Sequence, residues 1–177
     1  MRYEQEVSSG LLFKAKTGAI FHHKRKGPRT MEPHSIQEFH VLDGVAPVVV
    51  AIVFIIGSSL IIEPNRRNFM AIMIAGAGAA YLSGGALGKW EFAFTAVVTF
   101  CAYKGLHSYR FVGLGWILHT VWDITHHFYG APIIPFLSNS SAGCAITDAI
   151  IAVWFFANAP SIFDIAKMAR NKSPNSI

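Results

Sequence analysis

Long apolar runs alternate with short polar connections over most of the chain. Five runs have the length and character of helices that cross a membrane: residues 45–62, 69–87, 92–106, 111–129 and 142–159. A helix needs about 20 mostly apolar residues to cross about 30 Å of hydrocarbon, and it satisfies its own backbone hydrogen bonds there. The pattern therefore predicts an all-α fold, a multi-pass transmembrane helical bundle of about five spans that occupies residues 41–160.

The composition agrees with this expectation. Apolar residues make up 53% of the 177 residues and charged residues 14%, which is unusual for a soluble globular domain. The connections, such as "EPNRRN" and "GKWE", are too short to fold on their own. We therefore expect the lipid bilayer to be the main partner of the chain.

The two ends differ from the apolar part. Residues 1–40 hold seven of the fifteen Lys and Arg residues, with "HHKRKGPR" as the densest patch. Charge blocks of this kind are typical of disordered tails, and nothing beyond charge suggests a nucleic-acid partner, so none is expected. Residues 161–177 form a short C-terminal segment. Lys and Arg next to the spans place the first and third connections and the C-terminus in the cytoplasm by the positive-inside rule.

The second predicted span carries small residues at a helical spacing. Ala71, Ala75, Ala79 and Ser83 recur every four residues, with several glycines between them. Small residues let a neighbouring helix approach closely in lipid, so we expect this helix to lie centrally in the bundle. The alternative is a gap for a ligand beside Tyr81 and Ser83.

The fourth predicted span contains the segment "LHTVWDITHHFYG", in which four ionisable residues lie among large apolar ones. At about 100° per residue, these four residues share one sector of the helix: they are His119, Asp123, His126 and His127. Residues three or four apart on a helix are neighbours, so Asp123 can contact all three histidines. A carboxylate between imidazoles can orient them or bind a metal ion with them.

The fifth predicted span offers matching groups, with Ser141, Cys144 and Asp148 at helical spacing and Thr147 beside them. A rise of about 1.5 Å per residue puts Asp123 and Asp148 at the same depth, about 9 Å below one surface. The two antiparallel helices are therefore predicted to bring both carboxylates to one site.

Ionisable residues inside a membrane are costly and usually mark a function. The residue types fit a divalent metal such as zinc, with His119, Asp123, His127 and Asp148 as the predicted ligands. Asp148 and His126 are the candidate catalytic residues that would carry a proton. The alternative is a polar network that only holds two helices together.

Several long motifs resemble a known family. The run from "EPNRRNFMAIMIAGAGAAYLSGG" through "GWILHTVWDITHHFYGAPIIPF" to "SSAGCAITDAIIAVWFFANAPS" resembles the small integral membrane proteins of domain of unknown function 6010. The resemblance covers about residues 45–161 and implies a multi-pass helical membrane protein without an assigned activity.

Three functions compete. The first is a metal-dependent hydrolase that acts on a lipid-like amide or ester, similar in its His, Asp and Ser inventory to ceramidase-type membrane enzymes, although their order of motifs is absent. The second is a small carrier or a proton or ion relay built from the same residues. The third is a non-catalytic membrane scaffold. A di-iron oxygenase would need more histidines than the fourth span provides.

Overall fold

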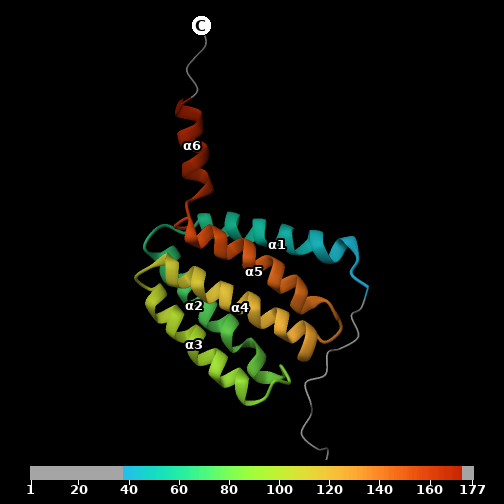
Figure 1. Cartoon of the computed structure of the whole chain (residues 1–177). Helices are drawn as coiled ribbons and strands as arrows, with labels where there is room; N and C mark the ends of the chain where they lie inside the picture. The colour runs from blue at the N-terminus through green and yellow to red at the C-terminus, as the bar shows by residue number, and fades with distance from the viewer. Residues whose placement is uncertain (1–37, 173–177) are drawn as a thin grey trace, which may run out of the picture. The chain divides into compact units, whose positions relative to one another are not determined.

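The structure is a computed structural model that describes residues 38–172. Over these residues the chain forms α-helices and one 3-10 turn, and no strand (Figure 1). The elements are α1 (Val41–Ser59), α2 (Asn65–Ala79), η1 (Ala80–Ser83), α3 (Lys89–Gly105), α4 (Tyr109–Tyr129), α5 (Ser140–Phe156) and α6 (Ile162–Lys172). The all-α prediction is confirmed, and each predicted span overlaps one of α1 to α5. The predicted basic tail lies almost entirely outside the described residues.

The structure differs from the predicted boundaries in two places. The second span does not continue as an α-helix to residue 87, because α2 ends at Ala79 and tightens into the η1 turn. Gly84 and Gly85 follow the turn, and glycine favours the end of a helix. The second difference is α6, a helix inside the C-terminal segment for which the apolar pattern predicts no span.

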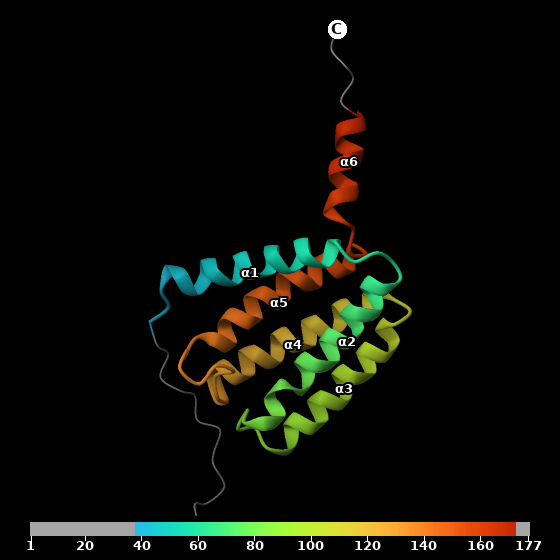
Figure 2. The same cartoon turned by 180° about the vertical axis from the view of Figure 1, so that it is seen from behind.

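Helix α4 lies at the centre of the bundle. It packs against α5 on one side and against α3 and α2 on the other, while α1 packs on the far side of α5. Both views show the order α1, α5, α4 (Figures 1 and 2). The expectation that the second span is central is therefore wrong, and the helix with the ionisable residues holds that place instead.

The connections gather at two ends of the bundle. At one end the Arg67 side chain donates from Nε to the carbonyl of Leu106 at 3.0 Å, which joins the α1–α2 and α3–α4 connections. At the other end the Ala131 N–H donates to the carbonyl of Gly85 at 3.1 Å, which joins the α2–α3 and α4–α5 connections. The predicted alternation of the connections is present in the fold.

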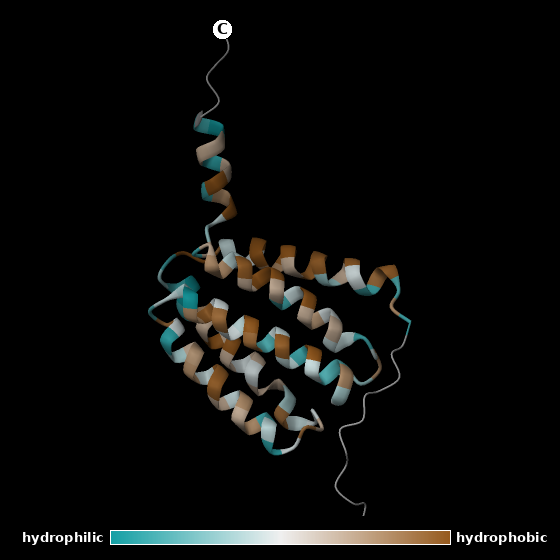
Figure 3. Cartoon of the chain, in the orientation of Figure 1, coloured by the Kyte–Doolittle hydropathy of each residue, from teal (hydrophilic) through white to brown (hydrophobic). Residues whose placement is uncertain are grey.

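Apolar and polar residues are distributed in an unusual way. Large apolar side chains are exposed along the helices, and α1 is apolar over most of its length (Figure 3). Several ionisable side chains, in contrast, are buried: Arg66, Glu91, His119, Asp123, His126 and Asp148. Among the described helices, α1 is the one whose length and composition suffice to cross a membrane, and α5 is a shorter apolar helix.

Close packing between α2 and α3 depends on Gly78. A Cβ atom at this position would lie 2.7 Å from Cγ1 and 2.9 Å from Cβ of the buried Val98. Gly78 is therefore the position at which α2 makes the predicted close approach to a neighbouring helix. Ala71, at one end of the small-residue stripe, is also buried and faces Gly105.

We expect Gly78→Ala to lower the free energy of unfolding by about 1–3 kcal/mol, because Val98 has no room to move away. Gly76→Ala is the matched control: it lies in the same helix with no atom near the added Cβ, and it should be neutral or slightly stabilising. Thermal unfolding in detergent measures both changes. A second change, Val98→Ala, should restore part of the lost stability, and equal behaviour of the two glycine variants would contradict the packing assignment.

Candidate metal centre

Three buried side chains from two helices meet inside the bundle. His119 and Asp123 lie one turn apart on α4, and Asp148 faces them from α5. One ligand atom of each residue lies within 4.8 Å of the other two. The predicted meeting of Asp123 and Asp148 across the fourth and fifth spans is thus confirmed. Equal depth on antiparallel neighbouring helices is the reason.

His119 is held in a defined orientation. Its Nε2 lies 2.9 Å from the carbonyl oxygen of Ala77 in α2. A carbonyl oxygen can only accept, so Nε2 carries the hydrogen and donates it. Metal-binding histidines commonly donate their second ring N–H to such a carbonyl, which fixes the ring and the tautomer.

The other ring nitrogen of His119 points at both carboxylates. Nδ1 lies 2.8 Å from Oδ2 of Asp148 and 3.2 Å from Oδ2 of Asp123. Because Nε2 already holds a hydrogen, a neutral imidazole would present a lone pair on Nδ1 to two carboxylate oxygens. Such a convergence of electron pairs needs either a proton, on Nδ1 or on a carboxylate oxygen, or a metal ion between them.

A tyrosine hydroxyl from another element holds Asp123 in place. The Tyr81 hydroxyl donates to Oδ1 of Asp123 at 2.7 Å and lies 3.2 Å from Oγ of Ser141. Asp123 thus has one oxygen bound to the tyrosine and the other free to face the cluster. The Ser141 hydroxyl oxygen also accepts the Ile133 N–H at 3.3 Å, which ties the α4–α5 connection to this site.

A second polar cluster lies beside the first. The Glu91 carboxylate in α3 accepts hydrogen bonds from Trp122 Nε1 at 3.2 Å and from the Leu87 N–H at 3.1 Å. His126 Nε2 lies 3.3 Å from the same carboxylate. The His126 ring stacks on the Tyr81 ring with centroids 3.7 Å apart. The Tyr81 ring and hydroxyl therefore connect Glu91 and His126 to Asp123.

The predicted site residues separate into three groups in the structure. His119, Asp123 and Asp148 form the metal-type cluster, and His126 belongs to the Glu91 cluster. His127 is half-buried, its Nδ1 has no hydrogen-bond partner among the described residues, and it lies outside the three-residue group. His127 lies eight residues beyond His119 on α4, about 12 Å along the helix axis, which is too far for both to share one ion.

Tyr81 and Glu91 also contact the site, although neither belongs to the fourth or fifth predicted span. Tyr81 enters the site because η1 turns its side chain inward, where the sequence suggests only a gap beside it. Glu91 has no sequence signal beyond its place in the first turn of a helix, where acidic residues are common for electrostatic reasons. Thr147 faces away, since its hydroxyl donates to the Pro47 carbonyl in α1 at 3.0 Å.

The sequence profile of a family of unknown function, DUF6010, matches residues 42–161. The chain belongs to this family. The matched region spans α1 to α5 and includes the cluster and its surroundings. A comparison with curated proteins and one with solved structures gave no match. Family membership therefore places the cluster inside the DUF6010 region and assigns it no activity.

Proposed function

We propose that the DUF6010 region is a multi-pass membrane bundle whose buried cluster binds a divalent metal ion and acts on a lipid-like substrate. The membrane part rests on the burial pattern. Apolar side chains such as Val53, Phe92 and Val121 are more than half exposed, whereas Asp123 is fully buried. Soluble proteins rarely expose apolar surface this extensively. A bilayer would cover it, and the positive-inside rule would then put the C-terminus in the cytoplasm.

The metal part rests on one observation, the convergence of His119 Nδ1, Asp123 Oδ2 and Asp148 Oδ2 with Nε2 held by Ala77. Zinc takes nitrogen and oxygen ligands at about 2 Å, and catalytic zinc sites commonly use three protein ligands and leave one position open. The three residues fit this donor set after small side-chain adjustments. All three are buried, so a bound ion would be shielded from bulk water.

A hydrolase is the activity that this arrangement supports best. A bound divalent ion makes a water molecule nucleophilic near neutral pH and polarises a substrate carbonyl. The second oxygen of Asp148 would serve as the base for the proton of that water, and the Tyr81 hydroxyl, which donates its one hydrogen to Oδ1 of Asp123, would hold that ligand in position. Water adds to the carbonyl, the ester or amide bond breaks, and the leaving group takes up a proton. Asp148 would return the proton taken from the water to the leaving group, which balances the reaction, and His126, which contacts Tyr81 by ring stacking, would lie beside this proton path.

A proton relay is the second candidate, and one observation favours it. The 2.8 Å contact between His119 Nδ1 and Asp148 Oδ2 has the length of a charge-assisted hydrogen bond. A proton on Nδ1 would satisfy the same two carboxylates without a metal. Hydrogen bonds between Asp123 and Tyr81 and between Tyr81 and Ser141 would extend the relay towards the α4–α5 connection.

Elemental analysis of the purified protein decides between these candidates. We expect about one divalent ion per chain, because three ligands and a dry site give a stable complex. The ion should be lost in Asp123→Ala and retained in His127→Ala, which removes a histidine of the same helix from outside the cluster. Protein purified without chelator that carries no zinc, iron or other transition metal would favour the relay. Loss of the ion in His127→Ala would contradict the three-residue assignment.

A further inference from the structure

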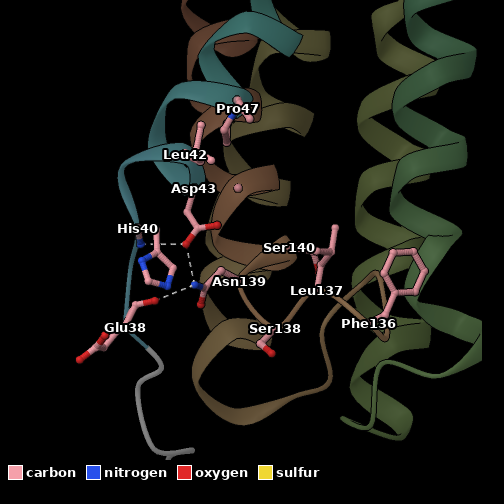
Figure 4. A pocket seen from close by; sticks show the side chains of 12 residues that line it. Glu38, His40, Leu42, Asp43, Pro47, Phe136, Leu137, Ser138, Asn139 and Ser140 are labelled. Atoms are coloured by element: carbon pink, nitrogen blue, oxygen red, sulfur yellow. Dashed lines mark hydrogen bonds between the residues drawn. The ribbon is translucent and has the colours of Figure 1, made fainter.

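An open groove of about 570 Å³ lies where α1 and α5 begin (Figure 4), and none of the three cluster residues lines it. It is lined by the first turns of α1 and α5 and by the connection that precedes α5. This connection also contacts the buried site, since Ser140 lines the groove while the adjacent Ser141 lies beside Tyr81. The groove and the surroundings of the proposed metal centre thus share the start of α5, where Ser140 and Ser141 are neighbours in the sequence.

A network of hydrogen bonds fixes one side of the groove. Oδ2 of Asp43 accepts the backbone N–H of His40 and the side-chain amide of Asn139, each at 2.9 Å. The Asn139 amide also contacts the carbonyl oxygen of Glu38 at 3.3 Å. These bonds join the start of α1 to the residue that precedes α5. Oδ1 of Asp43 receives no hydrogen bond from the described residues, so it is available to a ligand.

The groove is acidic. Two of the residues that line it, Glu38 and Asp43, carry carboxylates, and no Lys or Arg lines it. A hollow lined by charge of one sign concentrates ligands of the opposite sign. A cationic group is therefore the favoured polar part of an occupant.

The rim of the groove is apolar and continues along α1. Leu42 and Ala46 line the groove, and Val49 and Val53 follow at the i+3 and i+4 spacing that places residues on one helix face. All four side chains are exposed in the bundle. On the other side Phe136 is 84% exposed. An apolar strip therefore leads from the acidic groove along the outside of the bundle.

We propose that this groove binds an amphiphile with an ammonium headgroup, whose hydrocarbon chain lies along the Leu42–Val53 face of α1. The ammonium group would pair with Oδ1 of Asp43, and the chain would occupy the region that lipid fills in the proposed membrane location. This inference rests on the proposed function for its membrane location, and it assigns a ligand class to a groove that is separate from the buried cluster. A neutral or anionic amphiphile of equal length would lack the pairing group.

Photolabelling of the full-length protein in dodecyl maltoside micelles, whose headgroups carry no charge, tests the proposal. The probe is an eighteen-carbon primary amine with a diazirine in its chain, and the comparison probe is the carboxylate with the same chain. We expect the amine to label peptides from residues 41–53 and 136–143, saturably, and the carboxylate to label them weakly. Asp43→Asn keeps the shape of the side chain and should reduce labelling by about fivefold, the upper effect of an exposed ion pair.

Two further variants make the result specific. Ala46→Phe fills the groove without changing its charge and should also reduce labelling, whereas Asp164→Asn removes an exposed carboxylate from α6 and should leave it unchanged. Equal labelling by both probes, or unchanged labelling in both groove variants, would overturn the proposal. Metal content distinguishes the groove proposal from the metal-centre proposal. Asp43→Asn should retain its ion, so a negative labelling result would leave the metal-centre proposal unaffected.

Discussion

The double variant His119→Leu with Asp123→Leu is expected to fold and to insert into membranes, yet to contain no divalent ion and to lose its activity completely. Two of the three proposed ligands are removed, and Asp148 alone would not hold an ion. Insertion should not suffer, because two polar groups that are costly in a bilayer are replaced by apolar ones of similar size. The double variant would thus lose its function without losing its fold.

Size-exclusion chromatography, circular dichroism and elemental analysis of the same preparation measure this outcome. Thr125→Leu is the control, because Thr125 lies on the same helix and bonds only to the carbonyl of Val121. It should keep both fold and ion. If the cluster only held helices together, the double variant would be tolerated, since membrane hydrogen bonds contribute about 0.6 kcal/mol on average. A double variant that works normally in a cellular assay would support the scaffold alternative.

Removal of the Glu91 carboxylate is expected to cost stability rather than metal. In Glu91→Ala the Leu87 N–H, Trp122 Nε1 and His126 Nε2 lose their shared partner inside the bundle. A buried polar group left without a partner costs about 1–3 kcal/mol. We therefore expect the free energy of unfolding to fall by about 3 kcal/mol, measured by thermal or denaturant unfolding in detergent.

Two comparisons separate this effect from a general loss of charge. Glu91→Gln retains the side-chain shape and one acceptor oxygen, so it should lose less than half as much stability as Glu91→Ala. Asp164→Ala, at an exposed position on α6, should change stability by less than about 0.5 kcal/mol. Glu91→Ala should still bind one ion per chain, because Glu91 lies outside the ligand group. Loss of the ion without loss of stability would show that Glu91 acts on the cluster directly.

The helices and the common level of the two aspartates could be predicted from the sequence, for definite physical reasons. Apolar runs of about 20 residues form helices because every backbone group must be satisfied inside its own segment. The 3.6-residue period put His119 and Asp123 on one face of one helix. A short connection between antiparallel helices put Asp148 at the same depth, so its level followed from chain length, whereas the direction in which it faces did not.

The tertiary structure alone decided which side chains complete the site. His119 joins Asp123 and Asp148, whereas His127 does not, because packing over the whole interface sets the rotation and level of α4 against α5 and no local pattern encodes them. Tyr81 reaches Asp123 because α2 tightens into η1 before Gly84. Glu91 reaches His126 because α3 packs on α4. These contacts join residues 35 to 42 positions apart, and only the packed helices bring such distant residues together.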